Sequence, residues 1–419
     1  MDNVFTGKVA VIGLGYIGLP TAAALATRGI EVVGVDVNDD LVKAVGAGEV
    51  PLVEPDLAVA VSGAVAMGRL TASAETPWAD AYVIAVPTPF RDDHSADVSY
   101  IRATVEAIAP QLRGGELVIL ESTSPPGTTR AVSEWIADLR PDLTLPHASD
   151  GIPDVFIAHC PERVLPGRIM IEIVTNDRVV GGITPRCAEK AASLYRVFAQ
   201  GQILQSDASS AEMAKLVENA YRDVNIGFAN ELSLICERLK LDVWEVIKLA
   251  NHHPRVNILT PGPGVGGHCI AVDPWFIVSA APELANMIRA AREVNDSKPT
   301  HVARQVIAKA ARFNAPTIAC LGLAFKANVD DMRESPAVEV VAQIAEALPE
   351  VEVLVAEPYV DGLPPALRER PNVRLTRTTD ALEAADIVVS LVDHDQFRLL
   401  NRSLLSGKVV YDTRGIWRR

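Results

Sequence analysis

The stretch Lys8-Val9-Ala10-Val11-Ile12-Gly13-Leu14-Gly15-Tyr16-Ile17-Gly18 decides the fold. A short apolar run, typical of a buried strand, leads directly into the pattern Gly-x-Gly-x-x-Gly. The glycines permit a tight turn, a close approach of the backbone to a pyrophosphate, and close packing of a following helix against the strand. We therefore predict a strand, a turn and a helix whose N–H groups hold a dinucleotide. The residues expected to contact it here are Gly13, Gly15, Tyr16, Ile17 and Gly18.

A carboxylate at the expected distance strengthens this prediction. A second apolar run covers residues 31–36, and its last residue, Asp36, lies 18 residues after Gly18. A carboxylate at that place accepts hydrogen bonds from both ribose hydroxyls. The following residues 37–40 contain no arginine to bind a 2′-phosphate, which favours NAD over NADP. A glycine turn without a ligand is the plainer alternative, and the spacing of Asp36 argues against it.

Short apolar runs alternate with helical periods in both halves of the chain, which is typical of parallel sheets covered by helices. The predicted strands are 8–12, 31–36, 81–86, 116–121, 155–159, 317–321, 351–356, 386–392 and 408–411. The predicted helical stretches include 209–239, 280–313 and 336–347. We therefore expect an α/β protein with two Rossmann-like parallel-sheet domains joined by a long central helix. The expected domains are 1–205 (NAD-binding), 206–305 (helical, with a cysteine loop and a dimer surface) and 306–419 (a second Rossmann-like domain).

Composition narrows the classes of function. The 419 residues carry a formal net charge of −14, with 49% hydrophobic and 22% charged residues. Such a chain has room for large cores, and its acidic surface repels nucleic acid and anionic lipid. The five cysteines are scattered without metal-ligand spacing, so we expect neither disulfides nor a metal. No leader pattern and no run of about 18 apolar residues occurs, so we expect a cytoplasmic protein.

Polar turns follow two of the predicted strands. Pro87-Thr88-Pro89 follows the third predicted strand, and 121–129 (Glu-Ser-Thr-Ser-Pro-Pro-Gly-Thr-Thr) follows the fourth. Ligands bind at the carboxyl edge of such sheets, so hydroxyls there can reach the cofactor. Plain Ser/Thr/Pro turns remain the alternative for these segments.

The glycine-rich segment 261–274 (Pro-Gly-Pro-Gly-Val-Gly-Gly-His-Cys-Ile-Ala-Val-Asp-Pro) contains a cysteine, followed four residues later by an aspartate. The glycines shape a loop that lets a substrate approach the backbone, and Cys269 is placed there as a nucleophile. Asp273 can orient a water or a base. By contrast, we expect Cys187, Cys236 and Cys320 to be small buried hydrophobic residues.

A polar stripe lies on the predicted central helix. Lys215, Asn219 and Arg222 recur at i, i+4 and i+7 and therefore share one face. A solvated helix face and a buried face that meets an anion are both compatible with this pattern.

Together these motifs resemble the UDP-glucose/GDP-mannose dehydrogenases, which oxidise the C6 alcohol of a nucleotide sugar to a carboxylate with two NAD⁺. The resemblance covers essentially the whole chain. It rests on the GxGxxG, Ser122-Thr123, Pro161-Glu162, Lys215…Asn219, Gly266-Gly267-His268-Cys269…Asp273 and Lys326…Arg333-Glu334-Ser335-Pro336. A two-electron β-hydroxyacid dehydrogenase needs no cysteine in a glycine loop and no second α/β domain. A non-catalytic NAD sensor leaves Cys269 and Lys215 unexplained.

Within the family, segments 159–167, 252–257 and 266–276 resemble the branch that acts on UDP-N-acetyl-D-mannosamine. UDP-glucose enzymes carry Phe-Leu after the Pro-Glu and a lysine before the loop aspartate, whereas this chain has Arg163-Val164 and Val272. The resemblance therefore implies a 2-acetamido sugar and leaves UDP-N-acetylglucosamine open as an alternative to UDP-N-acetylmannosamine, with UDP-glucose less favoured.

The resemblance also implies roles. Cys269 forms the thiohemiacetal and thioester, Lys215 acts as acid/base beside Asn219, and Asp273, Glu162 and Thr123 hold the hydrolytic water. It implies a homodimer as well. Further residues expected to bind the cofactor are Thr88, Thr129 and Arg333. Those expected to bind the UDP-sugar are Arg163, Val164, Lys215, Asn219, Arg222, His253, Arg255, Gly266 and Lys326.

Overall fold

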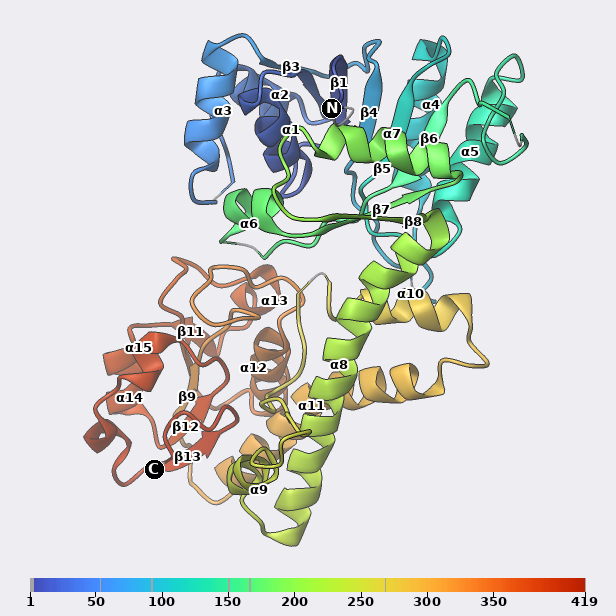
Figure 1. The fold of residues 1–419 in the computed structure, drawn as a ribbon. Helices are drawn as coiled ribbons and strands as arrows, with labels where there is room; N and C mark the ends of the chain where they lie inside the picture. Colours follow the sequence, from blue (N-terminus) through green and yellow to red (C-terminus); the bar gives the residue numbers. More distant parts are fainter. Residues whose placement is uncertain are drawn as a thin grey trace. The chain divides into compact units, whose positions relative to one another are not determined.

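The structure is a computed structural model that describes residues 4–52, 54–91, 93–149, 151–165, 167–267 and 269–418. It divides into two compact units, Met1–Glu218 and Asn219–Arg419, and the division falls inside the long helix α8 (Ala208–Leu239). Each unit is built on a sheet of its own, as the ribbon in Figure 1 shows. The prediction of an α/β protein with two sheets and a long central helix is confirmed.

The sheet of the first unit has the strand order β3-β2-β1-β4-β5-β6-β7-β8. Its strands are β1 (Lys8–Ile12), β2 (Glu31–Val35), β3 (Leu70–Ser73), β4 (Ala81–Ile84), β5 (Leu117–Leu120), β6 (Phe156–His159), β7 (Arg178–Gly182) and β8 (Ile203–Asp207). Strand β1 pairs in parallel with β2 on one side and β4 on the other, so the glycine turn that follows it lies where the strand order reverses. Ligands bind at this position in open α/β sheets.

The first sheet, predicted as a Rossmann-like parallel sheet, contains one antiparallel pair near its edge. Strand β7 runs antiparallel to β6, and β8 runs parallel to β7. The chain leaves β6 at the carboxyl edge of the sheet and re-enters through the short helix α6 (Ile169–Thr175), without crossing back over a face. A connection that returns at the same edge produces an antiparallel pair.

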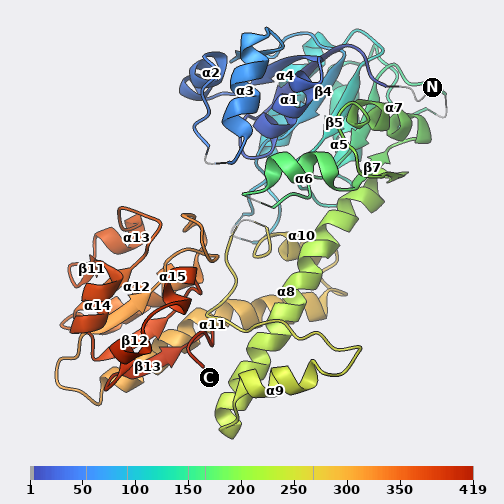
Figure 2. The same cartoon turned by 60° about the vertical axis from the view of Figure 1, so that its left-hand side comes forward.

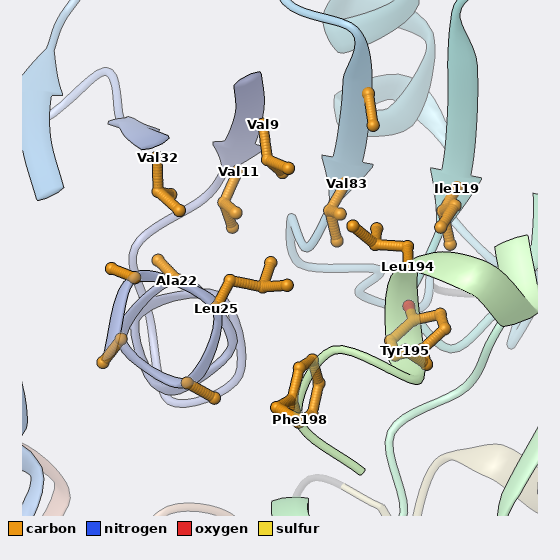
Figure 3. Close-up of a cluster of buried hydrophobic side chains, with 14 of the residues drawn as sticks. Val9, Val11, Ala22, Leu25, Val32, Val83, Ile119, Leu194, Tyr195 and Phe198 are labelled. Atoms are coloured by element: carbon orange, nitrogen blue, oxygen red, sulfur yellow. The ribbon is translucent and has the colours of Figure 1, made fainter. Parts of the chain in front are cut away.

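Two hydrophobic cores cover the two faces of this sheet. Alternate residues of the central strands point to opposite faces, so Val9 and Val11 join one core while Ala10 and Ile12 join the other. In Figure 3, Val9, Val11 and Val83 meet Leu25 of α1 and Leu194 of α7. The helices of this unit are α1 (Gly18–Thr27), α2 (Asp39–Gly46), α3 (Leu57–Ala66), α4 (Ser99–Ile108), α5 (Thr128–Leu139), α6 and α7 (Pro185–Tyr195), with a 3₁₀ turn at Ala109–Gln111.

The second unit combines a helical part with a parallel sheet of order β11-β10-β9-β12-β13. Its strands are β9 (Ile318–Leu321), β10 (Val353–Ala356), β11 (Val373–Leu375), β12 (Ile387–Ser390) and β13 (Val409–Asp412). Its helices after α8 are α9 (Val243–Ala250), α10 (Asp273–Ala280), α11 (Asn286–Ala310), α12 (Pro336–Ala347), α13 (Pro365–Arg368), α14 (Thr378–Ala384) and α15 (Asp395–Arg398), with a 3₁₀ turn at Arg402–Leu405. Figures 1 and 2 both show α11 crossing α8.

The turn after β9 repeats the geometry of the turn after β1. The N–H of Gly13 donates to the carbonyl of Val35 at 2.8 Å, and the N–H of Gly322 donates to the carbonyl of Ala356 at 2.8 Å. The next N–H, that of Leu323, donates to Glu357 Oε2 at 2.7 Å. Nε2 of the buried His394 lies 3.1 Å from the same carboxylate oxygen. The second sheet therefore has the same local architecture, with a buried histidine bound to the carboxylate that corresponds to Asp36.

The cysteines lie as predicted. Cys187, Cys236 and Cys320 are buried, whereas Cys269 is exposed. Among the described helices, none is both long and apolar enough to cross a membrane.

Candidate active site

The glycines of the first turn divide between packing and ligand access. Gly13 has a φ of +94°, and a Cβ there would lie 2.5 Å from the carbonyl oxygen of Ala85. A Cβ on Gly18 would overlap the carbonyl oxygen of Gly13, whereas a Cβ on Gly15 would meet no atom within 4 Å. The first and third glycines therefore let α1 pack against the sheet, and the second presents bare backbone to open space. Tyr16 is exposed and Ile17 half-buried beside it.

Asp36 is fixed against the same turn. Its Oδ2 accepts from the N–H of Leu14 at 2.8 Å, and its Oδ1 accepts from the N–H of Asn38 at 2.9 Å. Each oxygen keeps a lone pair, and the side chain is half-buried at the end of β2. The open face at Gly15 and this oriented carboxylate fit a dinucleotide with a free ribose 2′-hydroxyl.

Two threonines at the sheet edge have different surroundings. The hydroxyl of Thr88 is buried and has no hydrogen-bond partner among the described residues, so it can serve a ligand. Thr129 is fully buried, and its hydroxyl donates to Glu212 Oε1 at 2.6 Å. Glu212 on α8 also accepts from the N–H groups of Gly127 and Thr129 and so caps α5. The Thr129 hydroxyl is therefore committed to the anchoring of α8.

Glu162 belongs to a buried ionic cluster. Arg178, on β7, donates from Nη2 to Glu162 Oε2 at 3.2 Å and lies 3.8 Å from Glu121 Oε1. The ring of Tyr195 lies 4.8 Å from its guanidinium, and Thr21 donates to Glu121 Oε2 at 3.0 Å. Glu162 is 8% exposed, and its Oε1 accepts from the N–H of Arg163 at 2.6 Å. This cluster orients the Glu162 carboxylate in a largely dry environment.

Two carboxyl groups and one guanidinium share this interior, so their ionisation is coupled. Burial, reinforced by the nearby charge of Glu162 and opposed by Arg178, raises the pKa of Glu121 to about 8. Burial also lowers the pKa of neighbouring His159 to about 3, so this imidazole is neutral. Glu121 is therefore mostly protonated at neutral pH, and Arg178 is left to neutralise Glu162.

The loop of Cys269 leads directly into α10. Cys269 is exposed, and its carbonyl oxygen accepts from the N–H of Asp273 at 2.9 Å. Asp273 is the first residue of α10 and is 3% exposed. Its Oδ2 accepts from Nδ2 of Asn219 at 2.5 Å. A thiol, a buried carboxylate and an amide are thus brought together in the second unit.

Helix α8 carries the polar stripe predicted from the sequence. Lys215 is half-buried, Asn219 is 8% exposed and Arg222 is exposed. Near Lys215, Glu218 forms an ion pair with Arg163 Nη2 at 2.5 Å. The first turns of α8 are therefore anchored both to the cap of α5 and to the segment that contains Glu162.

Two glycines of the cysteine loop are needed for packing. The expectation that the loop glycines let a substrate approach the backbone stays a prediction. A Cβ on Gly266 would overlap the carbonyl oxygen of Glu334, and a Cβ on Gly267 would lie 2.9 Å from the ring of Phe325. Close packing of the loop against the segment around Phe325 and Glu334 therefore requires these glycines.

The cations expected to bind substrate lie on the surfaces of their units. Arg222, His253, Arg255 and Lys326 are exposed in the second unit. Arg333 is also exposed and pairs with Asp331 at 2.6 Å. In the first unit, Val164 is half-buried against the core, and Thr123 is half-buried after β5. His268 and Pro166, which belong to the quoted motifs, lie outside the described residues.

Comparison with known proteins accounts for all three parts of the chain. The UDP-glucose/GDP-mannose dehydrogenase family matches with its NAD binding domain at residues 7–199, its central domain at 209–297 and its UDP binding domain at 319–419. The chain belongs to this family. The resemblance noted from the sequence is thereby confirmed, and NAD is the cofactor of this dehydrogenase.

Individual relatives are similar over nearly the whole chain. The dehydrogenase is 56% identical to an NDP-N-acetyl-D-galactosaminuronic acid dehydrogenase of Ralstonia nicotianae, over 98% of this chain and 96% of that one. It is 53% identical to the UDP-N-acetyl-D-mannosamine dehydrogenase of Escherichia coli, over 98% and 99%. Among solved structures, the UDP-N-acetyl-mannosamine dehydrogenase of S. aureus superimposes with a TM-score of 0.87 at 39% identity, over 98% of this chain and 96% of that one.

Sequence reasoning missed the partners that hold the predicted residues. Arg178 and Glu212 belong to none of the motifs above, Glu121 was noted only as the first residue of the turn 121–129, and the partners of all three lie far away in the chain. One signal was available, because Glu121 directly follows an apolar strand at the edge where ligands bind. An acid at that place in a buried strand needs a partner.

Proposed function

We propose that this dehydrogenase oxidises the C6 alcohol of UDP-N-acetyl-D-mannosamine to the carboxylate in two successive steps. The observation that carries the proposal is the exposed Cys269, placed four residues before a buried aspartate that Asn219 holds at 2.5 Å. An enzyme that stops at the aldehyde has no use for a thiol at this position. A thiol lets one active site oxidise an aldehyde through a covalent intermediate.

The atoms and electrons balance with one water. The alcohol, two NAD⁺ and water give the carboxylate, two NADH and three protons, and NAD⁺ supplies the capacity to accept each hydride. Lys215 accepts the proton of the C6 hydroxyl as the aldehyde forms. The thiolate of Cys269 then adds to the aldehyde carbon, and the amide of Asn219 and the charged Lys215 stabilise the oxyanion. Loss of the second hydride leaves a thioester on Cys269.

Hydrolysis of the thioester needs an oriented water. Glu162 and Asp273 are carboxylates in largely buried surroundings, and Thr123 supplies a hydroxyl. We infer that they hold the water that attacks the carbonyl carbon, which breaks the carbon–sulfur bond and releases the Cys269 thiolate. Arg163, Val164, Arg222, His253, Arg255, Gly266 and Lys326 are proposed to bind the UDP-sugar. Arginine and lysine there offset the net charge of −14 locally.

A second substrate deserves a direct comparison. The relative that is 56% identical is named for N-acetylgalactosaminuronic acid, whereas the one at 53% is named for N-acetylmannosamine. Arg163 and Val272 separate this chain from UDP-glucose enzymes but do not distinguish among acetamido sugars. We expect the highest kcat/KM with UDP-N-acetylmannosamine in a panel that includes the UDP derivatives of N-acetylgalactosamine, N-acetylglucosamine and glucose. A higher kcat/KM for another UDP-sugar would make that sugar the substrate and would not affect the proposed two-step oxidation.

A homodimer is part of the proposal. Tyr221, Phe228 and Ile235 recur every seven residues on α8, and Leu239 follows one turn later. They are 69%, 54%, 48% and 61% exposed respectively, and together they form an apolar stripe along one face. A second copy of the chain is the occupant that we propose for it.

The decisive test of the chemistry is Cys269→Ser. A serine hydroxyl is scarcely ionised at neutral pH, and its alkoxide is a poorer leaving group than a thiolate. We expect turnover almost to stop, with at most about one NADH per active site and an adduct or aldehyde retained, as intact-protein mass spectrometry can show. Cys187→Ser is the matched control, because Cys187 is a buried cysteine of the first unit whose sulfur accepts from the Thr184 hydroxyl at 3.2 Å. Two NADH per sugar at the normal rate from Cys269→Ser would refute the covalent mechanism.

A further inference from the structure

The loop that carries Cys269 is held on both sides by buried polar side chains. Near its start, the N–H of Gly262 donates to Asn230 Oδ1 at 2.9 Å. Just past Cys269, the carbonyl oxygen of Ile270 accepts from Arg292 Nη1 at 3.5 Å. Asn230 lies on α8 and Arg292 on α11, and they are 0% and 1% exposed.

Two further side chains connect these anchors. Nδ2 of Asn230 donates to Asn295 Oδ1 at 2.8 Å, and Nδ2 of Asn295 donates to Asp223 Oδ1 at 2.8 Å. Arg292 Nη1 donates to the same Asp223 oxygen at 2.5 Å. A continuous chain of hydrogen bonds therefore runs from Gly262 through four buried side chains to Ile270.

This chain is more polar than helix packing requires. Helices α8 and α11 already approach closely, since a Cβ on Gly227 would lie 3.0 Å from the Cβ of Ala291. Apolar side chains would join the helices without the cost of burying an aspartate, an arginine and two amides. Hydrogen bonds have defined directions, so a polar chain fixes the register of the groups that it connects.

Helix α8 also holds the end of the loop through Asn219. Asn219 of α8 donates to Asp273, which begins α10 immediately after the loop. The backbone on either side of Cys269 is thus tied to α8 directly by Asn230 and indirectly through Asp223 and Arg292, and Asn219 holds the side chain of Asp273.

We propose that Asp223, Asn230, Arg292 and Asn295 are positioning residues that set the place of the Cys269 thiol relative to the Asn219–Asp273 pair. The inference rests on the proposed role of Cys269 as the nucleophile. None of the four side chains needs to touch the substrate. They act through the backbone of the loop, and a shift of about 1 Å in a reacting group can cost about 10²-fold in rate.

Asn295→Ala tests this proposal because it interrupts the middle of the chain without removing a contact to the loop itself. We expect kcat to fall about 10²-fold, the KM for NAD⁺ to stay within about twofold, and the rate of Cys269 alkylation by iodoacetamide to change several-fold. The matched control is Asn225→Ala, also on α8, where Nδ2 donates to the carbonyl of Tyr221 one turn earlier in the same helix. A lower melting temperature with unchanged kcat and alkylation would overturn the proposal.

A pair of substitutions at Asn230 gives a second test that does not depend on whether Asn295→Ala folds. Asn230→Asp keeps an acceptor for the N–H of Gly262 and loses only the donor to Asn295, whereas Asn230→Ala removes both. We expect Asn230→Asp to retain clearly more kcat than Asn230→Ala, and equal losses would contradict the proposal. Alkylation reports on the loop without turnover, so a changed alkylation rate would support the positioning role even if Cys269→Ser showed that the thiol is not the nucleophile.

Discussion

At the scale of single residues, Asp36 combines two tasks in one carboxylate. It orders the glycine turn through the N–H of Leu14, and we propose that its remaining lone pairs accept from the ribose of NAD⁺. We expect Asp36→Ala to raise the KM for NAD⁺ at least about 10-fold, because a hydrogen bond to a charged group contributes about 1.5–3 kcal/mol. The effect on kcat should be smaller, since the ribose is remote from the reacting carbon. Initial rates over a range of NAD⁺ concentrations measure both quantities.

The control for Asp36 is Asp40→Ala, an exposed carboxylate on α2 that forms a surface pair with Lys43. It should leave the KM for NAD⁺ unchanged. If Asp36→Ala instead lowered kcat about 10-fold and left the KM for NAD⁺ unchanged, Asp36 would not bind the ribose.

Glu121 makes stability depend on pH. Its pKa is raised from 4.5 to about 8 by burial, so the folded protein binds this proton more tightly than the unfolded chain. The tighter binding of this proton by the folded protein therefore adds its full contribution to the free energy of unfolding below about pH 4.5. This contribution is lost as the pH rises through about 8. We expect Glu121→Gln to lose less stability than the parent protein between pH 6 and pH 9, measured by urea denaturation.

Glu49→Gln, at an exposed position, is the control, and its free energy of unfolding should change between pH 6 and pH 9 by the same amount as that of the parent protein. If Glu121→Gln also lost stability in parallel with the parent, Glu121 would be ionised in the folded protein throughout that range.

At the scale of elements, the first turn and α1 separate packing from binding. A Cβ on Gly18 would overlap the carbonyl of Gly13, whereas a Cβ on Gly15 would meet open space. We expect Gly18→Ala to lower the melting temperature by several degrees, because the helix must move away from the strand. Gly15→Ala should melt near the parent temperature and raise the KM for NAD⁺ instead. If Gly15→Ala left the KM for NAD⁺ unchanged, no ligand would lie against Gly15.

The sequence did not predict β3, β7, β8 or β11, and two of these strands have identifiable reasons. Strand β7 begins with Arg178, which suggests an exposed loop until the carboxylates of Glu121 and Glu162 are known to surround it. Strand β8 reads Ile-Leu-Gln-Ser-Asp at the sheet edge, and its last residues are exposed, so no apolar period marks it. By contrast, α12 was predicted to its end residues because Ser335 and Pro336 mark its start, and the Ser335 hydroxyl accepts from the N–H of Ala337.

At the scale of the whole molecule, the apolar stripe on α8 predicts assembly. Phe228→Glu places a charge in its middle at a position that is 54% exposed in the single chain. We expect sedimentation velocity to show a dimer for the parent protein and a monomer, or a dimer that dissociates at micromolar concentration, for Phe228→Glu. Glu231→Ala on the same helix is the control. A monomeric parent protein would contradict the proposed homodimer.

The sequence predicted the residues of the site that stand in local motifs, but not the distant residues that hold them. Gly13, Asp36 and Cys269 stand in segments whose local pattern has a chemical meaning, and the structure places all three at exposed or half-buried positions. The anchors of the site are pairs such as Thr129 with Glu212, which lie 83 residues apart. Periodicity and spacing describe neighbours along the chain, so such pairs appear only once the chain is folded.

The boundary between the two units has a consequence for recombination between relatives. It falls between Glu218 and Asn219, inside a helix that starts directly after β8 without a loop. A junction there would join half a helix from each parent, and the side chains on either side bind different partners, Arg163 and Asp273. A chimera must therefore inherit all of α8 from one parent together with the segments that it touches. The first sheet looks like an interchangeable module, but no loop follows its last strand, because α8 begins directly after β8.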